Sequence, residues 1–396
     1  MPNIVCPSCN QREMRSFFKV ATVPTNSCLL FDTPEEAAAY PCGDIDLGFC
    51  DACGFMCNMA FDAALTEYSG RYEETQGYSG TFQKFHTALA ERLIDRHDLK
   101  GKKVLEIGCG KGEFLELLSK LGDVHGIGFD PGFHDDRLDS EAAKNLHFVK
   151  DFYSEKYADH KADFVCCKMT LEHIHETKDF MSTVRKAIGD NLETIVFFQI
   201  PEAKRIIKDC AFEDIYYEHC SYFTPGSLAD LFRRTGFEVL DVDTEYDDQY
   251  LTIEARPVAV VDHEANVARL PREEPIENLV QLVDSFPERC NEKLDNWRGK
   301  LAAMREAGQK VVLWGSGSKA VAFLTTLDPE GFVEYAVDIN PRRHDHYMPR
   351  TAQRIVGPEF LKSYEPDVVI IMNRVYTDEI TQDLNDMGLA PTIHAL

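Results

Sequence analysis

The chain has 396 residues, of which 44% are hydrophobic and 28% are charged, and its formal net charge at pH 7 is −25. This length predicts two or three domains of a soluble globular protein. The large negative charge would repel the phosphate backbone of a nucleic acid, which argues against nucleic-acid binding. No apolar run approaches the roughly 20 residues of a membrane span, and the sequence shows no secretory signal. We therefore expect a cytoplasmic protein with neither a nucleic-acid nor a membrane partner.

Two Cys-x-x-Cys pairs stand in the first part of the chain, Cys6 with Cys9 and Cys50 with Cys53. Two such pairs are the ligand set of a tetrahedral zinc ribbon. The odd total of 13 cysteines also favours thiols and a metal site over a disulfide framework. We predict a structural Zn²⁺ ion in a zinc-binding module over residues 1–62, with a redox pair or unrelated thiols as the alternatives. Three other cysteines lack this spacing and are expected to pack in the interior: Cys28, Cys42 and Cys57.

A polar, Gly-containing segment over residues 67–79 interrupts a helical pattern. It carries three tyrosines, Tyr68, Tyr72 and Tyr78. Tyrosines in a loop often stack on a ligand or form hydrogen bonds with it, although half-buried surface aromatics are the simpler interpretation of each one.

The stretch from Val104 to Gly112 is the most informative part of the sequence. An apolar strand ends in Glu106 and then in three glycines on alternate positions, Gly108, Gly110 and Gly112, before apolar residues follow at helical spacing. This pattern predicts the first strand, turn and helix of a doubly wound α/β sheet. The glycines let the backbone approach a ligand, and the helix N-terminus offers N–H donors. A dinucleotide-binding turn would carry its third glycine one residue later.

The strands that follow end in further candidate residues. Asp130 closes the second strand, about 20 residues after the glycines, where an acid accepts hydrogen bonds from ribose hydroxyls. Asp151 and Phe152 follow a short third strand, where a turn acid and a core aromatic are the alternative. Lys168 ends the fourth strand and is expected to face the same ligand crevice.

An aromatic segment containing Tyr216, Glu218 and His219 precedes a helix that Thr224 caps, with Pro225 at its first position. A histidine next to a carboxylate in an aromatic wall is what a positioned general base requires. A structural histidine is the alternative.

With these pieces in order, the chain resembles the sugar C-methyltransferases, the S-adenosylmethionine-dependent 3-C-methyltransferases of nucleotide-linked 4-keto deoxyhexoses. Tyr216–Phe223 is similar to the family motif Tyr-His-Glu-His-x-Ser-Tyr-Phe, and Leu171–Ile174 to Leu-Glu-His-Ile. Tyr217 departs from the motif, because the family usually has a histidine there. The likeness covers nearly the whole chain and implies a class I methyltransferase domain over 63–260 and a C-terminal Rossmann-like, substrate-binding domain over 261–396.

The resemblance also implies roles for the candidate residues. Glu106 would lie under the methionine end of S-adenosylmethionine, and Asp151 would meet the adenine amino group with Phe152 over the ring. His219 would remove a proton next to the ketone of the sugar, and the resulting carbanion would take the methyl group. The residues implied to assist at the sugar are His173, Tyr216, Glu218 and Tyr78. The alternatives are an O- or N-methyltransferase of another small metabolite, a non-catalytic binding protein and an NAD-linked oxidoreductase.

The last third of the chain begins with an acidic, Pro-containing linker over 257–275, and a helical pattern over 276–308 that we expect Pro287 to break. A second strand, glycine turn and helix follow over 310–320, with an acid, Asp338, after the next strand. This pattern formally permits a dinucleotide, whereas the resemblance implies a nucleotide-sugar. Its diphosphate and remaining groups would be bound by Ser316, Ser318, Lys319, Asn373 and Tyr376, and Arg342, Arg343 and His344 are further candidate phosphate ligands. We expect a monomer or a homodimer.

Overall fold

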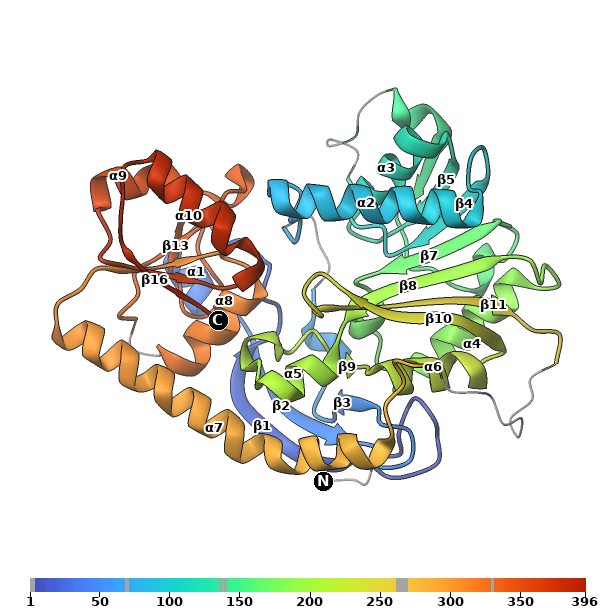
Figure 1. Cartoon of the computed structure of the whole chain (residues 1–396), viewed down its shortest axis with the longest axis horizontal. Coiled ribbons are helices and arrows are strands. Elements are labelled where there is room, and N and C mark those ends of the chain that lie inside the picture. The colour runs from blue at the N-terminus through green and yellow to red at the C-terminus, as the bar shows by residue number, and fades with distance from the viewer. Residues whose placement is uncertain (1–3, 68–70, 135–137, 139–140, 261–269, 329–330) are drawn as a thin grey trace.

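The computed structural model describes residues 4–67, 71–134, 138, 141–260, 270–328 and 331–396. Tyr68 and residues 261–269 of the predicted linker lie outside these residues. The described residues form three β-sheets, with the central sheet on the right of Figure 1, the C-terminal sheet on the left and the N-terminal sheet between them.

The central sheet has seven strands in the order β10-β11-β8-β7-β4-β5-β6. Five of them are parallel: β4 (Lys103–Ile107), β5 (His125–Phe129), β6 (Leu146–Val149), β7 (Phe164–Lys168) and β8 (Ile195–Pro201). The other two, β10 (Phe237–Glu245) and β11 (Tyr250–Pro257), form an antiparallel pair, and β11 is also antiparallel to β8.

Helices cover both faces of this sheet, because neighbouring residues of its buried strands point to opposite sides. Val104 packs with α2 (Gly80–His97) and α3 (Glu113–Gly122), whereas Leu105 packs with α4 (Thr177–Ile188) and α6 (Pro225–Arg234). The predicted doubly wound α/β fold is therefore confirmed.

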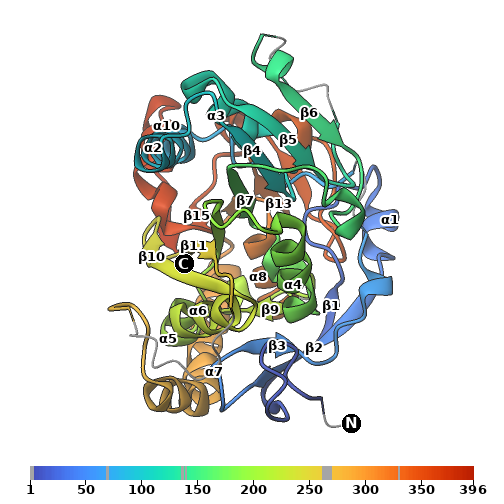
Figure 2. The ribbon, with the colours of Figure 1, turned by 90° about the vertical axis from the view of Figure 1, so that its right-hand side faces the viewer.

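The N-terminal sheet is antiparallel and contains β1 (Arg15–Pro24), β2 (Cys42–Phe49), β3 (Met56–Asn58) and β9 (Ser221–Tyr222). In Figure 2 it lies below the central sheet. The short helix α1 (Pro34–Ala38) is in the connection between β1 and β2. The strand β9 comes from the segment that follows His219, and it pairs with β3 of the cysteine-containing region.

The C-terminal sheet is parallel throughout, in the order β14-β13-β12-β15-β16. Its strands are β12 (Val311–Trp314), β13 (Tyr335–Val337), β14 (Arg354–Val356), β15 (Val368–Ile371) and β16 (Thr392–Ala395). Its helices are α8 (Ser318–Leu327), α9 (Leu361–Tyr364) and α10 (Thr377–Asp386). Parallel strands with helical crossovers give this part the expected Rossmann-like architecture. The division into three domains at 62/63 and 260/261 stays a prediction.

A single helix, α7 (Ile276–Glu306), runs along the lower edge of Figure 1 beneath the N-terminal and C-terminal sheets. The prediction that Pro287 breaks this helix is wrong. Phe286 packs on Phe18 of β1 with ring centres 5.0 Å apart, and Trp297 packs on Phe323 of α8 at 5.4 Å. Packing before and after Pro287 holds the helix together across the hydrogen bond that proline cannot make.

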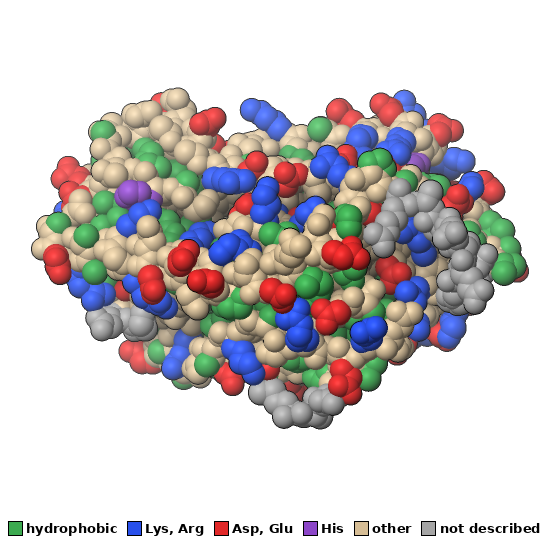
Figure 3. Space-filling view, turned by 60° about the horizontal axis from the view of Figure 1, so that its bottom comes forward, with side chains coloured by type: hydrophobic (Ala, Val, Ile, Leu, Met, Phe, Trp, Pro, Cys, Tyr) green, Lys and Arg blue, Asp and Glu red, His purple; other side chains and the backbone are tan. Residues whose placement is uncertain are grey.

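Side chains also bond a carbonyl next to this interruption. Ser285 Oγ and Arg289 Nη2 donate to the carbonyl of Leu282 at 3.2 and 3.1 Å. On the face of the molecule that contains this helix, acidic and basic side chains are interspersed (Figure 3). Among the described residues, no helix combines the length and apolar composition that crossing a membrane requires.

The short helix α5 (Ala203–Asp209) follows β8 directly and contacts α7. Its N-cap, Glu202, accepts hydrogen bonds from the backbone N–H groups of Lys204 and Arg205. The helix α5 thereby connects the central sheet to α7.

Candidate active site

A cavity of about 750 Å³ lies where the carboxyl ends of β4, β5 and β7 face the C-terminal sheet. Its wall contains both glycine turns, the loop from Tyr72 to Ser79 and the aromatic segment with His219. In open α/β sheets this end of the strands is where ligands bind. The cavity is therefore the candidate active site.

The glycine turn after β4 requires glycine for two reasons. Gly108 has φ +70°, and a Cβ built on it would lie 2.0 Å from Thr170 Oγ1. Gly110 has φ +53°, and both residues line the cavity. A side chain at Gly108 would therefore clash with Thr170, and the left-handed backbone disfavours any other residue. Gly112 also has a positive φ, +82°, but it stands at the start of α3 beside Phe148 and does not line the cavity.

Glu106 lies buried below this turn, and its Oε2 has no hydrogen-bond partner among the described residues. Burial raises the pKa of Glu106 to about 8, although Lys168 acts in the opposite direction. A buried acceptor without a donor is costly unless a ligand supplies one. The unpaired acid and the close-approach turn both fit a cationic cofactor such as S-adenosylmethionine.

Asp130 lies at the end of β5 and fixes the shape of the turn. Its Oδ2 accepts the Gly110 N–H at 2.9 Å, and its Oδ1 accepts the Gly132 N–H at 2.7 Å. Burial raises the pKa of this carboxyl, whereas the two backbone N–H groups lower it. The carboxylate lines the cavity and so can also reach a ligand there.

Lys168 ends β7 and is half-buried near Glu106. Its Nζ lies 2.9 Å from His86 Nε2 and 4.0 Å from the centre of the Phe114 ring. Burial lowers the pKa of Lys168 and lowers that of His86 to about 2. His86 was not among the sequence candidates, because nothing in the sequence pattern brings α2 to the end of β7.

Asp151 and Phe152 line the outer part of the cavity. The carboxylate of Asp151 accepts from Lys156 and from the hydroxyl of Tyr157, the latter at 2.6 Å. The hydrogen bond from Lys156 lowers the pKa of Asp151 to about 2. The Phe152 side chain is 62% exposed, so a ligand ring in the cavity could cover it.

Two histidines and a tyrosine meet in the inner wall. Tyr216 Oη and His219 Nε2 are joined by a hydrogen bond of 3.1 Å, and the ring of His173 stands nearly perpendicular to that of His219, with centres 4.8 Å apart. Burial lowers the pKa of His219 well below its usual value and lowers that of His173 to about 4. Both rings are therefore unprotonated at neutral pH. All three side chains line the cavity.

Glu218 does not line the cavity. Its carboxylate accepts the N–H and hydroxyl of Ser27, at 2.8 and 2.5 Å, and the hydroxyl of Tyr72 at 3.1 Å. Burial raises the pKa of Glu218 to about 7, although the hydrogen bonds from Ser27 and Tyr72 act in the opposite direction. Tyr217, where the resembling family has histidine, also turns away, and its hydroxyl accepts the Asp62 N–H at 2.8 Å.

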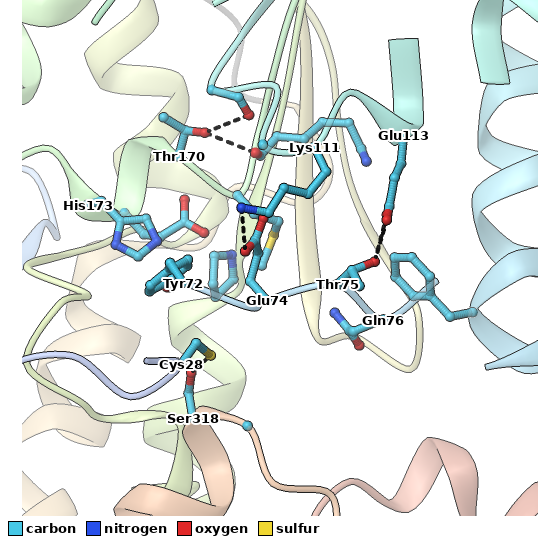
Figure 4. A pocket seen from close by; sticks show the side chains of 18 of the residues that line it. Cys28, Tyr72, Glu74, Thr75, Gln76, Lys111, Glu113, Thr170, His173 and Ser318 are labelled. Atoms are coloured by element: carbon cyan, nitrogen blue, oxygen red, sulfur yellow. Dashed lines mark hydrogen bonds and ion pairs between the residues drawn. The ribbon is translucent and has the colours of Figure 1, made fainter. Parts of the chain in front are cut away.

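The loop from Tyr72 to Ser79 closes the cavity between the two glycine turns (Figure 4). Glu74 faces Lys111 at 3.9 Å, and the Thr75 hydroxyl donates to both Glu113 oxygens at 2.8 and 2.7 Å. Burial raises the pKa of Glu74 to about 7, which Lys111 opposes. Tyr78 lines the cavity and is 42% exposed. The sequence signal for this loop was its polarity and its tyrosines, which did not single out Glu74 or Thr75.

The glycine turn after β12 faces the cavity from the opposite side. Ser316 donates to Asp338 through its N–H (3.0 Å) and its hydroxyl (2.6 Å) and accepts Nε of Arg343 at 2.7 Å. Lys319 Nζ lies 2.5 Å from the buried Asp214. The side chains of Asp338 and Arg343 thus hold the turn after β12 in place.

The remaining substrate candidates also line the cavity. The Ser318 hydroxyl lies 2.6 Å from that of Ser27, the Asn373 and Gln249 amides exchange two hydrogen bonds of 3.0 Å, and the Tyr376 hydroxyl donates to Gln76 at 2.7 Å. Arg342 and His344 do not line this cavity, although Arg343 does.

A separate cluster lies in the N-terminal region, where the sulfur atoms of Cys6, Cys9, Cys50 and Cys53 are all within 4.8 Å of one another. The distance between Sγ atoms is 3.8 Å for Cys6 and Cys53 and 3.7 Å for Cys9 and Cys50. Four thiolates about 2.3 Å from a tetrahedral zinc ion stand roughly 3.8 Å apart. The cluster therefore fits zinc.

Comparison with known proteins gives two family matches and several relatives. A methyltransferase domain matches residues 80–242, and a C-methyltransferase C-terminal domain matches residues 251–390. The C-methyltransferase NovU of Streptomyces niveus is 23% identical over 388 residues, which cover 95% of this chain and 90% of NovU. A ubiquinone biosynthesis O-methyltransferase of Shewanella sp. (strain ANA-3) is 29% identical over 143 residues, 30% of this chain and 60% of the relative.

Solved structures give weaker matches. One is 1,6-didemethyltoxoflavin-N1-methyltransferase of Burkholderia thailandensis with bound S-adenosylhomocysteine, at a TM-score of 0.35 and 16% identity, over 46% of this chain and 82% of that one.

Proposed function

Because the chain belongs to the C-methyltransferase family of S-adenosylmethionine-dependent enzymes, we propose that it methylates a carbon atom next to the ketone of a nucleotide-activated deoxysugar. One observation carries the proposal: a neutral histidine and a tyrosine hydroxyl, 3.1 Å apart, line the same cavity as the glycine turn. Methylation of carbon needs a base and an oxyanion donor side by side, whereas methylation of an oxygen or nitrogen needs no carbon acid.

Bound S-adenosylmethionine supplies a methyl group on a positively charged sulfur. Glu106 would compensate that charge, and the backbone at Gly108 and Gly110 would admit the cofactor. Asp130 would bind the ribose hydroxyls, while Phe152 would cover the adenine. These roles use Glu106 Oε2, which has no hydrogen-bond partner among the residues that the structure describes, and the Phe152 ring, which is largely exposed.

His219 is the proposed base. Its burial keeps the ring neutral at pH 7, so that a nitrogen lone pair is available for the proton next to the ketone. As the Tyr216 hydroxyl turns from His219 Nε2 to the ketone oxygen, it releases this lone pair and stabilises the enolate. The C–H electron pair becomes the enolate pair, and the proton stays on the imidazole. The enolate carbon would then form a bond to the methyl group as the methyl–sulfur bond breaks, and S-adenosylhomocysteine would leave with that electron pair.

The cavity wall formed by the C-terminal sheet is the proposed place for the nucleotide part of the sugar. Ser318 starts α8, where backbone N–H groups suit a diphosphate, and Lys319 follows it. Asn373 and Tyr376 extend this wall toward the loop over 72–79.

The four-cysteine cluster is proposed to hold a structural zinc ion, which would not take part in the reaction. Cys50→Ser should lower both the zinc content and the yield of soluble protein, because a small region with one metal centre depends on it to fold. Cys42→Ser is the matched control, since Cys42 is a half-buried thiol outside the cluster. Zinc content measured by mass spectrometry that is equal in both variants would contradict the proposal.

The test of the reaction is exchange of hydrogen at carbon. Candidate nucleotide-linked 4-keto-6-deoxyhexoses are incubated in D₂O with the full chain and S-adenosylhomocysteine, and deuterium next to the ketone is measured by NMR. We expect exchange that His219→Asn abolishes and that His175→Asn retains, because His175 lies close in sequence but does not line the cavity. Methyl transfer to oxygen or nitrogen without such exchange would support the O- or N-methyltransferase instead.

A further inference from the structure

Glu172 is a buried carboxylate in the wall of the cavity that the proposed reaction does not use. It lies in the 3-10 helix η5 (Leu171–His173), is 1% exposed, and neither of its carboxylate oxygens has a hydrogen-bond partner among the described residues. Glu218, buried to the same extent, accepts three hydrogen bonds. Buried carboxylates in proteins are paired or bind metal ions, so Glu172 lacks a partner that its position calls for.

Two imidazoles converge on this carboxylate. One oxygen of Glu172 and one ring nitrogen each of His173 and His219 lie within 4.8 Å of one another. Two histidines and one carboxylate are the protein ligands of many divalent transition-metal sites, in which the remaining positions stay open. Here those open positions would face a cavity of about 750 Å³.

The distances allow an ion to bind with small side-chain movements. Ligand atoms about 2.0–2.1 Å from a tetrahedral ion stand roughly 3.4 Å apart, so the three groups need to close by at most about 1.4 Å. Glu172 and His173 are neighbours in η5, and His219 stands two residues before β9. Both segments are held by hydrogen bonds, since Ser221 Oγ donates to the carbonyl of Ile174 at 2.6 Å.

The surroundings of the two rings also suit metal ligands. A metal-bound imidazole usually donates its second ring N–H to a carbonyl or another acceptor, which fixes its orientation. His173 Nδ1 lies 3.0 Å from the backbone carbonyl of Glu218, and an ion would then be bound through Nε2. The ring of His219 has such a partner for its Nε2, the hydroxyl of Tyr216 at 3.1 Å.

We propose that Glu172, His173 and His219 form a second metal site, which binds a divalent transition-metal ion such as Zn²⁺ or Co²⁺. Its ligands are harder than those of the four-cysteine cluster, so the two sites differ in the metals and chelators to which they respond. A consequence rests on the function proposed above: an ion bound through the other ring nitrogen of His219 requires the ring proton to stay on Nε2, which then has no lone pair to act as the base, and bound metal therefore inhibits the reaction.

The test uses the full chain with its cysteine cluster filled. Protein purified with zinc is treated with a mild chelator, titrated with Co²⁺, and followed by visible absorption and by metal analysis. We expect one further equivalent of Co²⁺, with the weak bands of nitrogen and oxygen ligands and without an intense thiolate charge-transfer band. Glu172→Gln and His173→Gln, each made separately, should weaken this binding at least tenfold, and His175→Gln should leave it unchanged.

The possible results separate this proposal from the function above. Absence of a second equivalent, or equal Co²⁺ affinity in Glu172→Gln, His173→Gln and the unaltered chain, would overturn the metal site. Thermal unfolding monitors the fold, and a variant that unfolds early is set aside in favour of the other. The exchange experiment in D₂O with chelator present tests His219 as a base independently, so loss of one proposal leaves the other standing.

Discussion

In the turn after β4 and in the turn after β12, a strand leads into a helix and an acid from the end of the next strand accepts backbone N–H groups. Asp130 accepts Gly110 N–H and Gly132 N–H, while Asp338 accepts Ser316 N–H and, through its other oxygen, Asn340 N–H at 2.9 Å. Both turns face the same cavity. Their local architecture is therefore the same.

The difference lies in what each turn leaves for a ligand. Two residues before its first glycine, the turn after β4 has Glu106, whose Oε2 has no hydrogen-bond partner in the described part of the chain, whereas the turn after β12 has the apolar Leu313. Gly108 has no room for a Cβ, but a Cβ on Gly317 would meet nothing within 4 Å. A shared strand, turn and helix therefore acquires its ligand preference from the charge below the turn and from the space above it.

The largest effect is expected from adding one methyl group to each turn. Gly108→Ala places a Cβ against Thr170 in a left-handed backbone, so affinity for S-adenosylhomocysteine should fall at least roughly 100-fold, or about 2.7 kcal/mol. Gly317→Ala, with φ −79° and open space, should change it less than about twofold. Calorimetry measures both. Equal losses would mean that the two turns serve the cofactor together.

The next comparison removes the acid of each turn. Asp130→Ala should cost about 1–3 kcal/mol of cofactor affinity, because a charged acceptor is lost and the Gly110 N–H is released. Asp338→Ala should leave cofactor affinity unchanged and lower the thermal midpoint, since the contacts of Ser316 and Asn340 are internal to the protein. Binding isotherms and thermal unfolding check these outcomes, and a cofactor defect in Asp338→Ala would contradict the assignment.

A smaller effect is expected from pH. The pKa of Glu106 is raised to about 8, so the free protein carries a proton there at pH 7. A cationic cofactor favours the carboxylate, and binding should therefore release a proton and strengthen by up to roughly 50-fold from pH 6 to pH 8. Calorimetry in buffers of different ionisation enthalpy measures the proton. Glu106→Gln should abolish this release, and its persistence would assign the proton to another group.

The smallest effect concerns the turn after β12. The ammonium of Lys319 is already paired with Asp214. Burial raises the pKa of Asp214, but Lys319 and Arg205 lower it by more, so that the pKa lies below its ordinary value. Lys319→Met should therefore weaken binding of UDP or dTDP only about three- to tenfold, and leave S-adenosylhomocysteine binding unaffected. Fluorescence or calorimetric titration with the two nucleotides checks this. No change in nucleotide affinity would remove Lys319 from the substrate wall.

Local sequence patterns predicted the elements on which both turns depend. The strand ends at Glu106, Asp130 and Lys168 line the cavity because parallel strands bring their carboxyl ends to one edge. Pro287 was misjudged because the penalty for one lost hydrogen bond is local, whereas the packing of α7 on β1 and α8 comes from distant residues.

The parts of the site that could not be predicted depend on long-range contacts. The Glu218 carboxylate turns toward Ser27, 191 residues away, and Tyr376 reaches Gln76 across 300 residues. The strand β9 has only two residues and therefore gives no periodic signal in the sequence. It is defined by pairing with β3, which lies far earlier in the chain. His86 and Glu74 join the cavity by the same kind of contact.

The pairing of β9 with β3 has a consequence for any shortened form of this protein. A chain begun at residue 63 would keep the whole seven-stranded sheet and both glycine turns, yet it would remove the strand against which Ser221 and Tyr222 are fixed. The exposed edge left behind would invite association with other molecules, and the histidine two residues upstream would lose its anchorage. The amino-terminal four-cysteine region therefore supports the segment that carries His219, and we expect shortened forms to need both parts.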